Sequence, residues 1–172
     1  MKVSVIGAGS WGTALAHLLG TAGNDVMLWA RKPEVCEGIN TLHRNPRYLV
    51  DSSVSERVRA SNDYETVLCG SQAVVVVTPS SIMRDVACDI RPFVSEDTPI
   101  IICSKGVEAG TGLLPVQVFE QELGNASRLA ALTGPNHAEE VIRGIASGTV
   151  IASSHRDTAL FFQRLFATDT FR

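Results

Sequence analysis

Short apolar runs alternate with longer segments of helical spacing along this chain. The apolar runs are rich in valine and isoleucine and cover residues 2–6, 25–30, 73–78, 99–103, 128–132 and 149–152. Apolar residues three and four positions apart predict helices within residues 13–19, 82–90, 113–123 and 158–166. Residues 73–77 are continuously apolar, as expected of a strand covered on both faces. The alternation predicts an α/β, doubly wound domain with a mostly parallel sheet.

No internal repeat, low-complexity segment or Pro/Gly/Ser-rich linker divides the chain. We therefore expect one domain over residues 1–172. Residues 161–166 are typical of a helix, and residues 168–172 are typical of a turn that leads into another strand. We expect the sequence to be the N-terminal piece of a longer protein.

The composition narrows the classes of partner. A net charge of −3 and a pI near 5.8 argue against a general nucleic-acid or anionic-membrane binder, because no basic run supplies a face that neutralises phosphates. Any anion must be held locally. The first strand begins without a charged leader, and no stretch approaches the ~20 apolar residues of a membrane span. These features predict a cytoplasmic location and no membrane span.

The four cysteines are widely spaced and form no C-x-x-C pair. They are Cys36, Cys69, Cys88 and Cys103, and most lie inside apolar segments, which is typical of buried thiols. We therefore expect neither a metal site nor a disulfide.

The segment Gly7-Ala8-Gly9-Ser10-Trp11-Gly12 matches G-x-G-x-x-G between a predicted strand and a predicted helix. In a Rossmann-type dinucleotide-binding domain, the first glycine permits the tight turn, the second lets a pyrophosphate approach, and the third lets helix and strand pack closely. The backbone amides of Ser10 and Trp11, in the loop, would reach the phosphates. The alternative is a strand, turn and helix built from small residues without a ligand.

The end of the second predicted strand bears on cofactor choice. An NAD-selective site usually has Asp or Glu there, about 20 residues beyond the glycines. This chain has Arg31 and Lys32 instead. A guanidinium can stack on adenine and pair with a 2′-phosphate, so the pattern favours NADP(H) over NAD(H). The alternative is that Arg31 and Lys32 are only solvated surface charges after a strand.

Two later strands run into polar segments that belong to the same edge of the sheet. Lys105 follows one strand, where a nicotinamide would lie, and Gly134 and Pro135 follow the other. We expect Gly134 and Pro135 to open a helix whose free amides hold an oxygen or a phosphate. Asn136 either contributes to the site or caps that helix. His137 either has a role in the site or is a partly buried polar residue with no chemical role.

Together these segments resemble the bacterial type of NAD(P)-dependent glycerol-3-phosphate dehydrogenase. The resemblance rests, in order, on GAGSWGTALA, LWARKPE, INTLHRNPRYL, VVVVTPSSIMRDV, CSKGVE and TGPNHAEEV, which cover nearly the whole chain. It implies hydride transfer with NAD(P) between sn-glycerol 3-phosphate and dihydroxyacetone phosphate, feeding phospholipid synthesis.

The motif and the resemblance together assign residues to the site. The cofactor residues are Gly7, Gly9, Ser10, Trp11, Gly12, Arg31, Lys32, Tyr48, Lys105 and Ala138. The substrate residues are Lys105, Gly134 and Asn136, with Lys105 as the substrate-positioning catalytic residue and no metal. The chain departs from the family at Asn136, usually Ser or Thr, and at His137, often Phe.

The resemblance also implies what this chain lacks. The family's general acid/base lysine and its phosphate-binding arginine and asparagine lie in a helical C-terminal domain beyond this sequence. We therefore expect this chain to be the cofactor half of an enzyme and to be inactive alone. Its oligomeric state stays open between a monomer and a homo-oligomer.

Two other readings stay open. A dehydrogenase of the β-hydroxyacid or 6-phosphogluconate type shares the predicted layout, although the chain lacks the glycine-rich segment typical of the β-hydroxyacid enzymes. A non-catalytic dinucleotide-sensing module would not need Lys105 and Gly134 near the nicotinamide.

Overall fold

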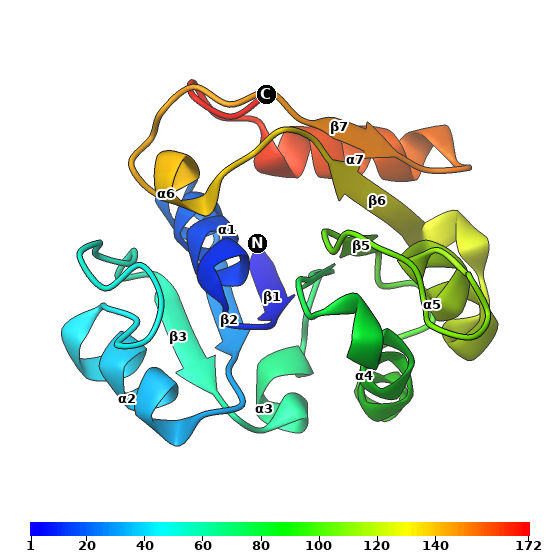
Figure 1. The fold of residues 1–172 in the computed structure, drawn as a ribbon, viewed down its shortest axis with the longest axis horizontal. Helices are drawn as coiled ribbons and strands as arrows, with labels where there is room; N and C mark the ends of the chain where they lie inside the picture. The colour runs from blue at the N-terminus through cyan, green and yellow to red at the C-terminus, as the bar shows by residue number, and fades with distance from the viewer.

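The computed structural model describes residues 1–172 and contains one seven-stranded sheet with helices on both faces (Figure 1). The strands lie in the order β3-β2-β1-β4-β5-β6-β7. Neighbouring strands are parallel from β3 to β6, and β7 pairs antiparallel with β6. The bounds are β1 Lys2–Ile6, β2 Asp25–Trp29, β3 Val58–Ser61, β4 Ala73–Val76, β5 Ile100–Ile102, β6 Leu129–Thr133 and β7 Val150–Ala152.

Seven α-helices connect the strands and cover the sheet. They are α1 Ser10–Thr21, α2 Pro33–Leu42, α3 Tyr64–Leu68, α4 Met83–Ile90, α5 Pro115–Leu123, α6 Ala138–Val141 and α7 Arg156–Phe166. One buried cluster joins the sheet to α1, α2, α6 and α7, and a second joins the opposite face to α3, α4 and α5. This is the predicted α/β, doubly wound, mostly parallel arrangement.

Strand β4 shows why the sheet is buried on both faces. Ala73 and Val75 belong to the first cluster, whereas Val74 and Val76 belong to the second. All four residues are fully buried. A strand with a helical layer on each side needs apolar residues at every position, and this requirement explains the uninterrupted apolar run.

The elements that the hydrophobic pattern did not predict are short or lie toward one end of the sheet. Strand β3 has only four residues and alternates buried with more exposed positions. Helix α2 begins at Pro33 and buries only Val35, Gly38 and Ile39, while α3 has five residues. Such short patterns carry little periodicity. None of the helices combines the length and the hydropathy that a membrane span requires.

The cysteines are less buried than the sequence predicted. All four are free, and only Cys103, next to β5, is buried. Cys69 ends α3 and Cys88 lies on the outer side of α4, and both are exposed. The prediction was wrong for these two because an apolar segment can still turn one side chain toward water.

Candidate functional site

The site lies where the strand order changes direction, between β1 and β4. Successive connections run to opposite sides of this point, so the loops that leave the two strands separate and form a crevice at their carboxyl ends. A cavity of about 460 Å³ occupies this position. Residues from the glycine loop (Gly7–Gly12) and from the segments that follow β2, β4 and β5 line it.

The three glycines of the loop have different steric requirements. Gly7 has a φ of +116°, and a Cβ there would lie 2.8 Å from the Val77 carbonyl oxygen. A Cβ on Gly12 would lie only 1.8 Å from the Gly7 carbonyl oxygen, whereas a Cβ on Gly9 would meet nothing within 4 Å. Gly7 therefore lets the turn pass close to the segment after β4, Gly12 lets α1 pack against the turn, and Gly9 leaves the backbone open toward a ligand.

The N-terminus of α1 is available to an anion. Helix α1 begins at Ser10, so Ser10 and Trp11 occupy its first turn and not the preceding loop, which corrects the sequence prediction. Gly9 is the N-cap, supplies no side-chain cap, and no acidic residue lies in the first turn. The first amides of a helix have no acceptor within it, so these N–H groups can bind phosphate oxygens.

The charge of the cavity is opposite to that of the whole chain. Four cationic residues line it, and no Asp or Glu is among its lining residues. The cations are Arg31, Lys32, Arg47 and Lys105. The net charge of the chain is −3. The local positive potential of this cavity attracts an anion, although the protein as a whole is negatively charged.

The segment after β2 supplies most of this charge. Arg31 and Lys32 are exposed and follow the buried Ala30. Arg47, which the sequence reasoning did not single out, pairs with Glu34 at 3.0 Å. The pKa of Glu34 is kept below its usual value by a hydrogen bond from the Glu34 backbone amide and by the Arg47 guanidinium. Glu34 therefore holds Arg47 beside the cavity while remaining outside its lining.

One residue that lines the cavity has a buried hydroxyl without a hydrogen-bond partner. Thr78, two residues after β4, is 4% exposed, and its Oγ1 has no partner. Thr78 also lines the cavity. A buried hydroxyl usually forms a hydrogen bond, so the Thr78 Oγ1 has unused donor and acceptor capacity.

Lys105 lies on a loop held by charged hydrogen bonds. Its Nζ donates to the Gly134 carbonyl at 3.1 Å. Three residues further on, Glu108 accepts two hydrogen bonds of 2.8 Å from Arg84 of α4. These bonds, with another from Thr111, lower the pKa of Glu108 to about 2. A bidentate arginine–carboxylate pair restricts the loop and thereby the position of Lys105.

The segment after β6 differs from its prediction. Helix α6 begins at Ala138 with His137 as its N-cap, so Gly134 and Pro135 do not open it and Asn136 does not cap it. The Asn136 amide instead donates to the Gly148 carbonyl at 2.8 Å, which ties this turn to the chain before β7. Of the predicted residues here, Gly134, Asn136 and Ala138 do not line the cavity. Gly134 is connected to it through Lys105.

The other predicted cofactor residues lie together. Every one of them except Ala138 lines the cavity, and these are Gly7, Gly9, Ser10, Trp11, Gly12, Arg31, Lys32, Tyr48 and Lys105. Ala138 is 8% exposed and packs in the core against the α1 side of the sheet. No group of three or more His, Cys, Asp or Glu residues is arranged to hold a metal ion.

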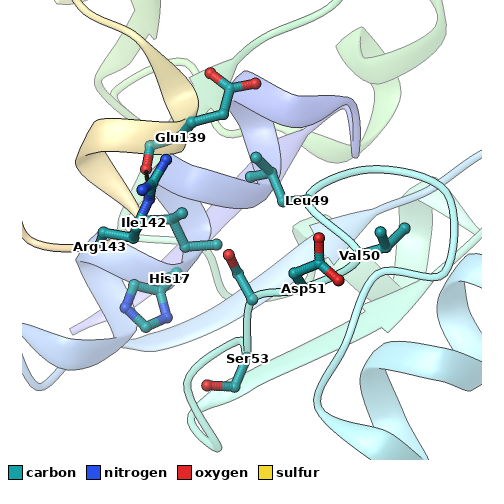
Figure 2. A pocket seen from close by; sticks show the side chains of 9 residues that line it. His17, Leu49, Val50, Asp51, Ser53, Glu139, Ile142 and Arg143 are labelled. Atoms are coloured by element: carbon teal, nitrogen blue, oxygen red, sulfur yellow. Dashed lines mark hydrogen bonds between the residues drawn. The ribbon is translucent and has the colours of Figure 1, made fainter.

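A second cavity, of about 640 Å³, lies beside α1 and contains none of the predicted residues (Figure 2). His17 of α1, Asp51 of the 49–53 loop, and Glu139 and Arg143 of the α6 region face it. Burial lowers the pKa of His17. The mixture of acidic and basic side chains gives this hollow no consistent charge, in contrast to the first cavity.

The residues of the first cavity fit a dinucleotide. The open backbone at Gly9 and the free amides of α1 suit a pyrophosphate, and the cationic lining suits further phosphate charge. A carboxylate for the adenosine ribose is missing from the lining.

The comparisons with known proteins agree with this fit. A family described as the NAD-dependent glycerol-3-phosphate dehydrogenase N-terminus matches residues 2–159. A relative named glycerol-3-phosphate dehydrogenase [NAD(P)+], from Myxococcus xanthus, is 42% identical over 174 residues, with 100% of this chain and 52% of the relative covered. A Brucella canis relative of the same name is 37% identical over 99% of this chain and 52% of its own length.

Solved structures extend the similarity to the fold. The glycerol-3-phosphate dehydrogenase of Coxiella burnetii superimposes with a TM-score of 0.93 at 29% identity, over 99% of this chain and 52% of that one. The UDP-D-ManNAc dehydrogenase of Pyrococcus horikoshii reaches 0.75 at 15% identity, over 96% of this chain and 44% of that one, which is a likeness of fold alone. This chain spans about half the length of the curated relatives named above.

Proposed function

This chain belongs to the NAD-dependent glycerol-3-phosphate dehydrogenase family, whose N-terminal part it matches, and we propose that it is the cofactor-binding half of such an enzyme. The reaction proposed is hydride transfer with NAD(P) between sn-glycerol 3-phosphate and dihydroxyacetone phosphate. We place the enzyme in the cytoplasm, where its product would feed phospholipid synthesis.

One observation carries this proposal. The cavity at the β1/β4 switch point combines the three glycines, the uncapped start of α1 and a lining with four cations and no carboxylate. Each feature alone occurs in many proteins, but together they provide hydrogen-bond donors and positive charge for a dinucleotide in one place.

The lining also favours NADPH over NADH. Arg31 and Lys32 stand after β2, where an NAD-selective site usually has an acid for the ribose hydroxyls. Arg47 adds a third cation at the same cavity. A guanidinium forms charge-assisted hydrogen bonds with a phosphate, and its planar face can stack on adenine.

At the other end of the cavity, Lys105 is the candidate for contact with both cofactor and substrate. When bound, the nicotinamide supplies or accepts the hydride. Lys105 can donate a hydrogen bond to the substrate oxygen and stabilise developing negative charge there, and Gly134 holds its Nζ through a backbone carbonyl. Gly134 and Asn136 are proposed for the substrate side, and Ala138 for the cofactor side.

By resemblance, the reaction uses a second group besides Lys105. Reduction of a ketone requires a proton donor for the developing alkoxide. By resemblance, we assign this role to a lysine in the other half of the family's enzymes. The 172-residue chain should therefore bind the cofactor without appreciable turnover.

The test follows the intrinsic fluorescence of the purified chain, because Trp11 lies in the first turn of α1 and lines the cavity. The chain is titrated with NADPH and with NADH, each with and without dihydroxyacetone phosphate. We expect tighter binding of NADPH, a change of affinity with dihydroxyacetone phosphate, and negligible oxidation of NADPH. Absence of any response to either nucleotide would contradict the proposal.

A further inference from the structure

A loop from His43 to Val54 forms the outer wall beside the glycine loop. It is closed at its base, where the Val54 amide donates to the His43 carbonyl at 2.7 Å. Arg47 and Tyr48 lie in this loop and line the cofactor cavity, yet both are exposed. Glu34 pairs with the Arg47 side chain, but the backbone that carries both residues needs an attachment of its own.

Asn45 is the residue that attaches this loop to the rest of the domain. It is 1% exposed and is the only buried residue between Ile39 and Val54. A polar residue this deeply buried must use its hydrogen-bonding groups, because an unpaired buried amide is unfavourable. Asn45 uses both ends of its side-chain amide.

The nitrogen of that amide bonds to the glycine loop and α1. Nδ2 donates to the Ala8 carbonyl at 3.0 Å and to the Thr13 hydroxyl at 2.8 Å. Ala8 lies between Gly7 and Gly9, so this bond orients the peptide unit that precedes the open Gly9 position. The Asn45 side chain therefore acts on the backbone that would receive the pyrophosphate.

The oxygen of the amide holds the other wall. Oδ1 accepts from the backbone amides of Arg47 at 3.0 Å and Tyr48 at 3.2 Å. One buried side chain thus fixes two parts of the cavity, reaching Ala8 across 37 positions of the sequence and the Arg47 and Tyr48 amides within its own loop.

The backbone of the loop supports the same conclusion. Leu49, the residue after Tyr48, has a φ of +55°. A non-glycine residue in this left-handed region costs ~1–3 kcal/mol and persists only where its surroundings impose it. Leu49 packs against the core, and the Asn45 bond to the Tyr48 amide lies on its N-terminal side.

We propose that Asn45 is a positioning residue for the dinucleotide site: it holds Tyr48 and Arg47 against the bound cofactor and orients the glycine loop at Ala8. The inference rests on the proposed function and deepens it. Asn45 itself does not line the cavity and acts through these neighbours.

The test is a double-mutant cycle on NADPH affinity with Asn45→Ala, Tyr48→Ala and the double variant. We expect Asn45→Ala to weaken NADPH by about tenfold, because both walls lose hydrogen bonds that fix them, and Tyr48→Ala to weaken it several-fold. In the Asn45→Ala background, Tyr48→Ala should change little, since Tyr48 is no longer held. Additive effects would overturn the proposal.

The matched control is Asn40→Ala. Asn40 also bridges two elements with its side-chain amide, donating to the Ala60 carbonyl and accepting from the Ala60 amide, both at 2.8 Å. It does not line the cavity or contact the glycine loop. Asn40→Ala should lower thermal stability and leave NADPH affinity unchanged. An equal loss of affinity in both variants would reduce Asn45 to a general structural role and overturn the proposal.

A measurement on the unaltered chain covers the case in which Asn45→Ala does not fold. The amides of Arg47 and Tyr48 should exchange slowly with solvent deuterium and more slowly with NADPH bound. Exchange at the rate of an unprotected loop, with or without NADPH, would overturn the proposal. If the unaltered chain binds neither nucleotide, the proposed function itself fails. If it binds NADPH normally but Asn45→Ala and Tyr48→Ala show no coupling, only the role of Asn45 fails.

Discussion

Separate replacement of Gly9 and Gly12 by alanine tests whether the glycine loop serves a ligand or only the fold. The two positions lie three residues apart, and each variant adds one methyl group. In Gly12→Ala the new Cβ would lie 1.8 Å from the Gly7 carbonyl oxygen, whereas in Gly9→Ala it would meet nothing within 4 Å. The same chemical change therefore has opposite expected consequences.

The expected magnitudes follow from these distances. Real Cβ atoms essentially never approach within 3.0 Å, so α1 and the Gly7 backbone must separate by at least about 1.2 Å in Gly12→Ala. A forced backbone shift of this kind costs about 3 kcal/mol or more, which lowers Tm by roughly 6–12 °C for a domain of this size. Gly9 has φ −72° and ψ −175°, which alanine can adopt, so Gly9→Ala should stay within about 1 kcal/mol of the original stability.

The assay combines thermal unfolding with NADPH titration. Gly9→Ala should unfold near the original temperature but bind NADPH at least about tenfold more weakly, because its methyl group occupies the approach to the backbone amides. Gly12→Ala should lose stability first. Unchanged NADPH binding by a folded Gly9→Ala variant would refute the reasoning, since the open space at Gly9 would then serve no ligand.

Two further predictions concern charge. Arg31→Ala should weaken NADPH binding by about tenfold while NADH binding changes little, because the lost hydrogen bonds are to a charged 2′-phosphate. The control is Arg57→Ala, since Arg57 is an exposed arginine paired with Asp25. An equal loss of binding for both nucleotides would assign Arg31 to adenine stacking. The pKa of Glu108, lowered from 4.5 to about 2 by Arg84 and then Thr111, makes its stabilising contribution complete above pH 4.5 and lost toward pH 2. Glu108→Gln should therefore flatten the fall in Tm over that range, and an unchanged acid profile would contradict this account.

The sequence predicted the centre of the fold well because its signals are local. Strand β1 was predicted with its observed bounds, and β4 was recognised from an apolar run that two helical layers explain. The need for Gly12 is also local, since its Cβ would meet the Gly7 carbonyl within one strand-turn-helix unit, whereas the close contact at Gly7 is with Val77 beyond β4. Strand β3 and helices α2 and α3 were not predicted because their short segments bury few side chains.

The parts of the site that were missed depend on contacts distant in sequence. Asn45 bonds to Ala8 across 37 positions, and nothing local distinguishes it from an ordinary turn residue. The alternative that Asn136 caps a helix failed for the same reason, because its partner is the Gly148 carbonyl and not a helix amide. Arg47 belongs to the segment INTLHRNPRYL that carried the family resemblance, but only the fold brings it beside Arg31 at the cavity.

The most direct test of the central claim is a map of the backbone amide resonances of the chain during titration with NADPH. The account predicts the largest changes at the amides of Gly9, Ser10 and Trp11, with further changes at Arg31. Changes centred instead on His17 and residues 49–53, around the second cavity of Figure 2, would contradict it and place the nucleotide elsewhere.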